Sequence, residues 1–226
     1  MAVNYGTSIV TDGLLMLADA ANTRSYPGSG TSWTDLSGNG NTFALTGTPP
    51  SYNAGGYFTF NGSTQSTSIA SFAPTVSAYS MICWIYSAAF QNSFTGIFAA
   101  RSGGNAYGLG CTFGPVSGVT NQLGYSWAAL TTYSWSSGLI IPNSQWSMVA
   151  ISTTTTSATL YLNNNSATNS HAATSFTFPG IALGYDSAVG TRYFNGNISS
   201  AMVYNRALSS TEIQQNYNAY RGRYGI

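Results

Sequence analysis

The feature that most constrains the fold of this chain is a series of short apolar, aromatic-rich runs, each bounded by turn-forming residues. Ten such runs occupy residues 14–18, 57–60, 79–86, 96–100, 105–113, 123–128, 145–152, 158–163, 180–185 and 197–204. Aliphatic and aromatic residues favour strands, whereas clusters of Gly, Asn, Ser and Pro favour turns. Short strands that recur at this spacing predict an all-β, antiparallel jelly-roll sandwich, with residues 1–226 forming one domain.

Two of the runs are apolar at successive positions rather than only at alternate ones. They are YSMICWIY at 79–86 and QWSMVAIS at 145–152. A strand of this kind is covered on both faces, so we expect these two strands at the centre of a sheet. Trp84 and Trp146 lie within them and are therefore assigned to the core.

The C-terminal segment YNRALSSTEIQQNYNAYRGRYGI (204–226) carries the one clear helix signal of the chain. Ser209 stands three residues before Glu212, which is the spacing of a capping box. In that motif the serine hydroxyl accepts from the N–H of Glu212, and the Glu212 carboxylate accepts from the N–H of Ser209. Leu208 and Ile213 stand at the two positions of a hydrophobic staple.

The predicted helix has about three turns and needs another surface to pack on. Ile213, Tyr217 and Tyr220 follow at i, i+4 and i+7, so they form one apolar stripe. Gly222 is expected to end the helix in a left-handed conformation, and the arginines on either side of it suit the negative end of the helix dipole. We expect this helix to cover the sandwich.

The chain has very few charges, which make up only 5% of its residues, and its formal net charge is +1. No basic cluster is dense enough to indicate a nucleic acid or an anionic membrane as partner. No run approaches the ~18 apolar residues of a transmembrane helix, and the N-terminus lacks the basic n-region of a signal peptide. A nearly neutral surface tolerates close packing of copies, so we expect a homo-oligomer.

Cys83 and Cys111 are the two cysteines, and both lie in strand-like runs. Buried free thiols are common in such runs, and two cysteines without a secretory signal do not define a disulfide framework. Free thiols are the favoured interpretation, and a disulfide between the two is the alternative.

Three blocks of the chain resemble a known family. They are LADAANTRSYPGSGTSWTDLSGNGN (17–41), WSMVAISTTTTSATLYLNN (146–164) and RYFNGNISSAMVYNRALSSTEIQQNYNAYRGRYG (192–225). Their content and order are similar to those of the laminin-G-like, concanavalin A-like lectin/glucanase jelly-roll domains. The DLSGNGN opening and the YNRALS ending are similar to domains found in tailed-phage structural proteins.

This resemblance implies a non-enzymatic protein of the virion surface, either a capsid decoration or a fibre protein, which becomes extracellular on lysis. Its partners would be other virion proteins of the capsid or tail, with weak adhesion to a host-surface polysaccharide. The alternative is a dedicated carbohydrate-binding lectin or receptor-binding module.

Hydrolysis of a glycan, the activity of related sandwiches, needs two carboxylates that flank the scissile bond. The acidic residues of the chain are Asp12, Asp19, Asp35, Asp186 and Glu212. Glu212 is already explained as a helix cap, and the aspartates are not spaced to alternate along one strand. His171, the only histidine, lies in a polar stretch, is expected to be a solvated loop residue, and has no G-x-S-x-G elbow to serve. We therefore expect no enzymatic activity.

A calcium site is one interpretation of the turn-rich region near the N-terminus. Asp19 and Asp35 flank a loop, and Asn39 and Asn41 follow closely. Calcium sites commonly use two or more carboxylates together with backbone carbonyls. The two FNG sequences of the chain stand where the family has F-D-G, so two carboxylates are missing. This favours the alternative, in which Asp19 and Asp35 hydrogen-bond to turns and no cofactor is bound.

A group of aromatic residues is the best candidate for glycan binding. In the run LGYSWAALTTYSWSSG, Tyr125 and Trp127 share one strand face, and Tyr133 and Trp135 would share one if the chain is extended. Tyr107 on a neighbouring run could join them. Exposed aromatic rings stack on the C–H faces of sugars. The alternative is that these rings pack in the core or in a subunit contact.

Overall fold

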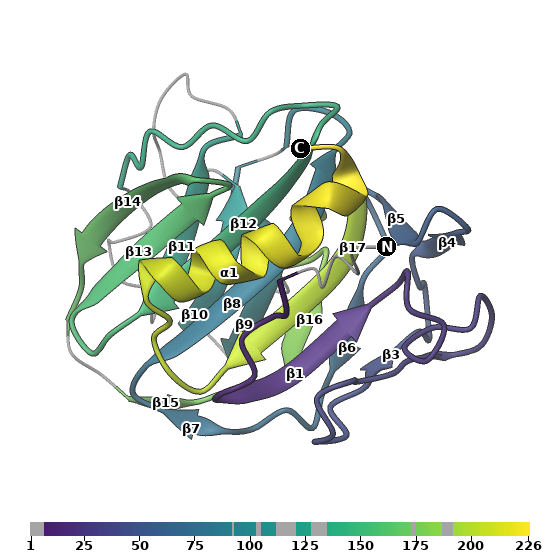
Figure 1. The fold of residues 1–226 in the computed structure, drawn as a ribbon, viewed down its shortest axis with the longest axis horizontal. Coiled ribbons are helices and arrows are strands. Elements are labelled where there is room, and N and C mark those ends of the chain that lie inside the picture. The colour runs from purple at the N-terminus through teal and green to yellow at the C-terminus, as the bar shows by residue number, and fades with distance from the viewer. Residues whose placement is uncertain are drawn as a thin grey trace, which may run out of the picture.

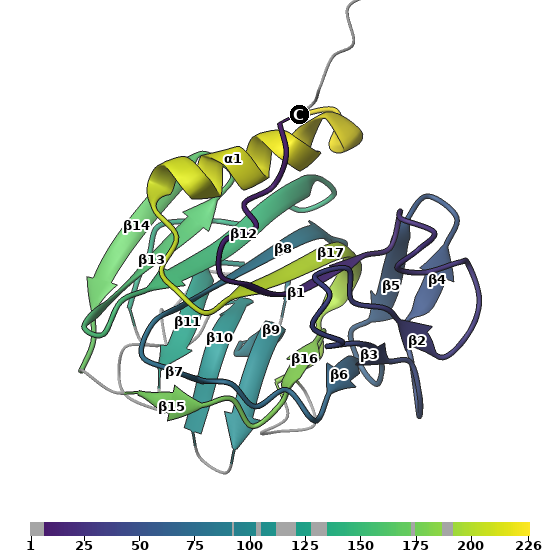
Figure 2. The ribbon, with the colours of Figure 1, turned by 60° about the horizontal axis from the view of Figure 1, so that its bottom comes forward.

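The computed structural model describes residues 7–91, 93–102, 105–111, 121–127, 135–172, 175–186 and 192–226. Within these residues, two large antiparallel sheets form a sandwich, and one α-helix lies across the outside of one sheet (Figure 1, Figure 2). The predicted class, an all-β jelly-roll sandwich with one short C-terminal helix, is therefore confirmed.

One sheet of the described chain has eight strands. They are β1 (Leu14–Asp19), β4 (Ser51–Asn53), β5 (Tyr57–Asn61), β8 (Tyr79–Ser87), β12 (Trp146–Thr153), β13 (Ser157–Leu162), β14 (Asn165–Ser170) and β17 (Asn195–Tyr204). Their order across the sheet is β14-β13-β12-β8-β17-β5-β4, and β1 also pairs with β17.

The opposite sheet has seven strands among the described residues. They are β2 (Ser32–Trp33), β3 (Phe43–Ala44), β6 (Thr67–Ile69), β9 (Thr95–Ser102), β10 (Asn105–Cys111), β11 (Leu123–Trp127) and β16 (Ile181–Leu183). Their order is β11-β10-β9-β16-β6-β3-β2, and a small separate pair joins β7 (Thr75–Val76) to β15 (Phe176–Thr177). The chain ends in α1 (Ser210–Tyr220) and the 3₁₀ helix η2 (Arg221–Tyr224).

Each of the ten predicted runs contains a strand. The two strands expected at the centre are central, because β8 pairs with β12 on one side and with β17 on the other, and β12 pairs with β8 and β13. The strands that were not predicted are two or three residues long, except the six-residue β14, in which Ala167 is the one apolar residue.

Strand β8 shows why the eight-stranded sheet needs cover on both faces. Met81, Cys83 and Ile85 point into the core between the two sheets. Ile82 and Trp84 point to the outer face, where they join a second apolar cluster beneath α1. Alternate residues of a strand face opposite sides, so a strand that is apolar throughout stabilises the fold only when both sides are buried.

Helix α1 supplies the cover for the outer face (Figure 1). The predicted stripe of Ile213, Tyr217 and Tyr220 is buried against the sheet, as expected. The ring of Tyr217 stacks on that of Trp84, with 5.7 Å between centroids and 15° between planes. None of the described helices is long and apolar enough to cross a membrane.

The assignment of Trp84 to the core is confirmed, whereas that of Trp146 is wrong. Trp84 is completely buried. Trp146 is only partly buried and belongs to neither core cluster. It is the first residue of β12 and lies on the outer face, where the ring of Tyr224 from η2 packs against it at 4.7 Å.

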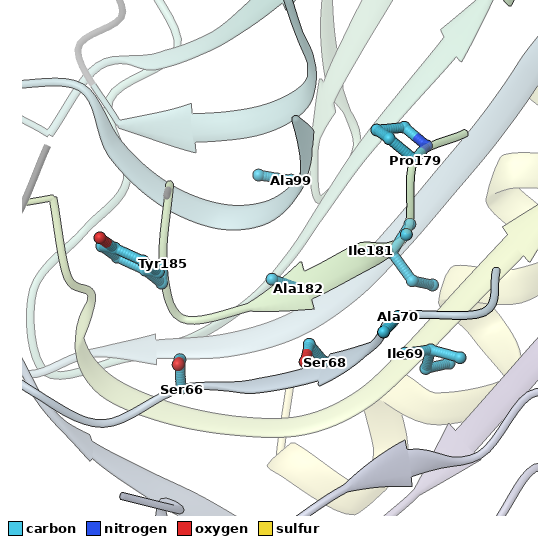
Figure 3. A pocket seen from close by; sticks show the side chains of 10 residues that line it. Ser66, Ser68, Ile69, Ala70, Ala99, Pro179, Ile181, Ala182 and Tyr185 are labelled. Atoms are coloured by element: carbon cyan, nitrogen blue, oxygen red, sulfur yellow. The ribbon is translucent and has the colours of Figure 1, made fainter. Parts of the chain in front are cut away.

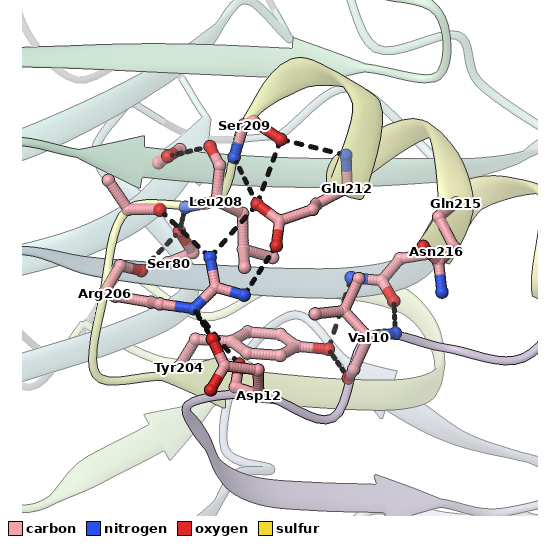
Figure 4. A network of polar contacts seen from close by, with 12 residues as sticks. Val10, Asp12, Ser80, Tyr204, Arg206, Leu208, Ser209, Glu212, Gln215 and Asn216 are labelled. Carbon is pink, nitrogen blue, oxygen red and sulfur yellow. Dashed lines mark hydrogen bonds and ion pairs between the residues drawn. The ribbon is translucent and has the colours of Figure 1, made fainter.

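The capping box that begins α1 is present as predicted (Figure 4). The N–H of Glu212 donates to the Ser209 hydroxyl over 3.3 Å, and the N–H of Ser209 donates to Glu212 Oε2 over 2.8 Å. Arg206 adds two hydrogen bonds that the motif did not predict, at 2.6 Å to Oε1 and 3.0 Å to Oε2. Arg206 first, and the Ser209 backbone second, lower the pKa of Glu212 to about 2.

Two buried serines fasten the connection from β17 to α1 onto the sheet. The Ser80 hydroxyl donates to the carbonyl of Arg206 over 3.0 Å and accepts from the N–H of Leu208 over 2.9 Å. The Ser152 hydroxyl donates to the carbonyl of Leu208 over 2.7 Å. Because Leu208 is itself buried, these bonds satisfy backbone groups that would otherwise lack partners.

One polar residue, Asn216, is buried within the apolar side of α1. Its Oδ1 accepts from the N–H of Val10 over 2.9 Å, and its Nδ2 donates to the hydroxyl of Tyr204 over 3.2 Å. The same hydroxyl donates to the carbonyl of Val10 over 2.9 Å. This closed set of bonds joins the N-terminal segment, β17 and α1 (Figure 4).

The end of the helix differs from the prediction. Gly222 is not left-handed, because the chain continues from α1 into η2, and Gly225, with φ of 72°, takes that conformation instead. Arg223 was expected to face the helix dipole. It forms a bidentate ion pair with Asp19, with 2.8 Å from Nη1 to Oδ1 and 2.9 Å from Nη2 to Oδ2. This pair ties the C-terminus to the end of β1.

Cys83 is a free thiol buried in the core between the sheets. Burial raises the pKa of this thiol, so it stays protonated and behaves as a small apolar side chain. The side chain of Cys111 lies outside the described residues.

The capping box generates the first prediction. Removing both side chains in a Ser209→Ala, Glu212→Ala double variant leaves the first N–H groups of α1 without these acceptors. We expect a loss of about 1–2 kcal/mol in the free energy of unfolding, or about 3–6 °C in Tm. Circular dichroism melting measures this loss. The control is Ser210→Ala, a serine truncation at the next exposed residue, which makes no capping bond. A double variant that melts at the same temperature as this control would contradict the assignment.

The lowered pKa of Glu212 generates a prediction on pH. The carboxyl titrates near 4.3 in the unfolded chain and near 2 in the folded one, so its contribution to stability is complete above about pH 5 and is lost as pH falls toward 2. The difference in Tm between the native protein and a Glu212→Gln variant should therefore be largest above pH 5 and shrink toward pH 2. A difference that stays constant over this range would show that the Arg206 contact does not depend on charge.

Candidate functional site

Two of the predicted glycan-binding aromatics are buried. Tyr125 and Trp127 both have 0% of their surface exposed and belong to the core between the sheets. The prediction that they offer an exposed stacking face is therefore wrong, and the alternative of core packing holds for them. Tyr125 and Trp127 do share one face of β11, as predicted, but that face points into the core between the sheets.

Trp127 lies in a stack of rings with Tyr79 and His171. The indole is 6.1 Å from the ring of Tyr79 at 9° and 3.9 Å from the imidazole of His171 at 25°. Its Nε1 donates to the carbonyl of Ala172 over 3.1 Å. The prediction of a solvated His171 is wrong, since only 9% of this residue is exposed.

Of the other three aromatic candidates, the structure describes the side chain of Trp135 alone. Trp135 is partly buried and packs edge-on against Tyr125, with 6.3 Å between ring centroids. The backbone of Tyr107 pairs with that of Trp127, and its side chain lies outside the described residues. Tyr133 lies wholly outside them.

The two aspartates considered for calcium are occupied by donors of the protein itself. Asp19 holds Arg223, and its Oδ1 also accepts from the N–H of Ala21 over 3.0 Å. Asp35 accepts from the N–H groups of Leu17, Ser37 and Asn41, at 3.0, 2.8 and 2.9 Å, and from the Ser37 hydroxyl at 2.8 Å. Asp35 therefore hydrogen-bonds to turns, as the alternative to a calcium site predicted, whereas Asp19 mainly forms an ion pair with Arg223. Among the described residues, no group of three or more His, Cys, Asp or Glu could hold a metal ion.

The outward face of the seven-stranded sheet has a feature that the sequence did not reveal, a continuous row of small side chains. From one edge to the other, the row is Ser32, Ala44, Ser68, Ala182, Ala99, Gly108 and Ser126. Their chain neighbours Phe43, Ile69, Leu183 and Phe98 point into the core instead. We call this row the trough.

The trough is open over part of its length. Ser68 is exposed and Ala182 is partly exposed, whereas Ala99 has only 5% of its surface exposed. A shallow pocket of about 270 Å³ lies over this stretch, between β6, β16 and β9 (Figure 3). With side chains no larger than serine on its floor, a ligand could approach the backbone of the sheet closely.

The ring of Tyr185 lies at one end of the pocket, and that of Pro179 lies at the other (Figure 3). Tyr185 stacks on Tyr193 with 4.1 Å between ring centroids and 12° between planes, so its ring is held in place. Burial first, and the hydrogen bond with Tyr193 second, raise the pKa of Tyr185, so its hydroxyl remains a donor at neutral pH. A Cβ at Gly96 would collide with the backbone of Tyr185 and Asp186, so a glycine is needed there.

The chemistry of this pocket is that of hydrogen bonding and stacking. Ser66 and Ser68 contribute hydroxyl groups, and none of the described residues that line the pocket carries a charge. Asp186, next to Tyr185, is 1% exposed and pairs with Arg192 at 2.9 Å, so its charge is balanced. An uncharged ligand with hydroxyl groups and an apolar face fits this lining.

The comparisons with known proteins agree with the fold. Residues 59–214 match the family described as the concanavalin A-like lectin/glucanases superfamily. Among solved structures, a sialidase from Trypanosoma rangeli with sialic acid bound is 12% identical, with a TM-score of 0.69 over 97% of this chain and 36% of the sialidase chain. The chain thus spans about a third of that protein.

Two further structures share the fold at similarly low identity. Domain 4 of an extracellular GH43 arabinanase from Geobacillus stearothermophilus, in complex with arabinotriose, is 19% identical, with a TM-score of 0.64 over 91% of this chain and 98% of that domain. The receptor-binding domain of botulinum neurotoxin type G is 13% identical, with a TM-score of 0.60 over 91% of this chain and 51% of that one. No curated protein matches the chain in sequence. Since the family match spans more than half of its residues, the chain belongs to the concanavalin A-like lectin/glucanase superfamily.

Proposed function

We propose that this chain is a non-enzymatic carbohydrate-binding protein that holds a neutral glycan in the trough of the seven-stranded sheet. The observation that carries this proposal is the uncharged pocket with a floor of Ser68, Ala182 and Ala99, and with the fixed ring of Tyr185 at its end. A sugar ring could stack on Tyr185 while its hydroxyl groups bond to the serines. The sugar bound to the arabinanase domain of the same fold supports this class of ligand.

The absence of carboxylates from the pocket lining supports binding without hydrolysis. Glycoside hydrolysis uses a pair of carboxyl groups, one on each side of the bond. Among the described residues that line the pocket, none is acidic. Glu212, the one glutamate of the chain, is committed to the helix cap and to Arg206.

Filling the trough tests the proposal. Ser68 is exposed on a strand, where phenylalanine is well accommodated, so a Ser68→Phe variant should fold normally and block the floor of the pocket. We expect it to weaken retention of the protein in gels that contain soluble arabinan, xylan or galactomannan by about tenfold in Kd, the effect of losing ~1.4 kcal/mol of contact.

The matched control is Ser170→Phe on β14, which is also exposed but lies on the eight-stranded sheet. It should be retained like the native protein. Equal retention of the two phenylalanine variants would contradict a site in the trough. Failure of the native protein to bind any neutral polysaccharide would contradict the proposed function itself.

A second candidate places the protein on a virion surface, as a capsid decoration or fibre protein whose glycan binding is an adhesive property. The low charge of the chain supports it, together with three large apolar residues that are exposed among the described residues. They are Phe90 at 73%, Ile140 at 47% and Ile226 at 41%. Burial of these side chains in contacts with other virion proteins, or with further copies of the chain, would stabilise such an assembly.

Mass spectrometry of purified particles tests this second candidate. A decoration protein should be present at a high, fixed copy number per particle, and a fibre protein at a low one. Its absence from particles, with polysaccharide binding retained, would leave the dedicated lectin as the function.

A further inference from the structure

The outer face of the eight-stranded sheet carries a group of partly exposed rings at the edge of the apolar cluster beneath α1. Tyr57, Tyr86, Trp146 and Tyr224 are all of intermediate exposure, and we call them the outer aromatic patch. The centroid of the Trp146 ring lies 5.6 Å from that of Tyr57, 5.8 Å from that of Tyr86 and 4.7 Å from that of Tyr224. Trp146 is thus the centre of the patch.

Two kinds of contact hold the patch in place: ring stacking on the buried Trp84 and pairing between neighbouring strands. The ring of Tyr224 stacks on the buried Trp84 at 4.4 Å and 23°, so η2 anchors the patch to the apolar layer beneath α1. Trp146 and Tyr86 are directly paired across β12 and β8. A rigid aromatic surface loses little conformational entropy when a ligand binds to it.

Polar groups continue from the rings along the same face. Tyr86 is paired with Asn197, and Asn197 is paired with Thr59, so ring, amide and hydroxyl stand side by side on β8, β17 and β5. The Thr59 hydroxyl donates to Asn197 Oδ1 over 2.9 Å. That bond sets the orientation of the amide, and no described residue hydrogen-bonds to its Nδ2, which therefore remains available as a donor.

The charges near the patch are balanced. The guanidinium of Arg223 lies 6.0 Å from the centroid of the Tyr224 ring, and its charge is offset by the bidentate pair with Asp19. No residue of the patch is charged, nor is Asn197 or Thr59. The described patch offers no charged side chain to pair with an ionic ligand, whereas a neutral ligand with an apolar face and hydroxyl groups matches its rings, amide and hydroxyl.

We propose that the outer aromatic patch, together with Asn197 and Thr59, is a second carbohydrate site that takes a neutral sugar stacked on Trp146 and Tyr86. It lies on the sheet opposite the trough, so each site can be lost while the other is kept. A chain with sites on two opposite faces could join two polysaccharide strands, or gain avidity on one strand that reaches both.

Tryptophan fluorescence tests this site selectively, because the trough pocket has no tryptophan among its lining residues. We expect titration with arabinan, xylan or galactomannan to change the emission of the native protein. The change should persist in Ser68→Phe, in which the trough is blocked, and should vanish in Trp146→Phe, which keeps an aromatic ring but removes the indole. Tyr86→Ala and Asn197→Ala should each weaken the response by about tenfold in Kd.

Tyr161→Ala on β13 is the matched control, since Tyr161 is partly buried on the same outer face but makes no ring contact with the patch. Asn197→Ala keeps the test valid if a ring variant fails to fold. An emission change that survives unaltered in Trp146→Phe, or that is lost in Ser68→Phe, would overturn the second site.

No emission change with any of the three polysaccharides would also overturn it. Sedimentation velocity would then test whether the patch is instead a contact between copies of the chain. Self-association that Tyr86→Ala abolishes, without a response to sugar, would assign the patch to a protein contact.

Discussion

The structure depends on burying both faces of β8, β12 and β17 at once. These strands carry apolar residues on successive positions, so one face needs the opposite sheet and the other needs α1. The helix is too short to be stable alone and must be fixed to the sheet. Much of the small charge complement of the chain serves this purpose, through Arg206 with Glu212 at one end and Arg223 with Asp19 at the other.

Because the large apolar side chains are buried between the sheets or under α1, two other surfaces remain exposed to bind a ligand. The seven-stranded sheet turns its large residues inward, and its outward row is left with serine, alanine and glycine. On the eight-stranded sheet, α1 and η2 cover the outer face only as far as Tyr224. Beyond that ring, Trp146 and Tyr86 remain partly exposed beside Asn197. The described side chains of the pocket over the trough and of the outer aromatic patch are uncharged and include hydroxyl, amide or aromatic groups, which is the chemistry that neutral sugars require.

Much of the fold could be predicted from local patterns in the sequence, because each signal spans only a few residues. The short aromatic run at 57–60, the two-sided apolar runs and the capping box at Ser209 are examples. Strands of two or three residues, such as β2 and β3, are too short for any periodicity to appear. The pair of Asp19 and Arg223 joins residues 204 positions apart, and no local pattern predicts such a partner.

The sites could not be predicted, for a different reason. Periodicity shows that Tyr125 and Trp127 share a face, but only the tertiary structure shows that the face points inward. The trough is assembled from one residue on each of seven strands, so it exists only once the strand order and register are known. Trp146 looked like a core residue because it begins an apolar strand, yet the cover provided by α1 and η2 does not bury it fully.

The most direct test of carbohydrate binding on these two faces is a titration of the ¹⁵N-labelled protein with a neutral oligosaccharide, followed by amide chemical shifts. At 23.7 kDa the protein is within reach of this method. Binding as described would move the amides of β6 and β16 around Ser68 and Ala182, and those of β8 and β12 around Tyr86 and Trp146. Shifts confined to other parts of the molecule, or no shifts with any neutral oligosaccharide, would contradict it.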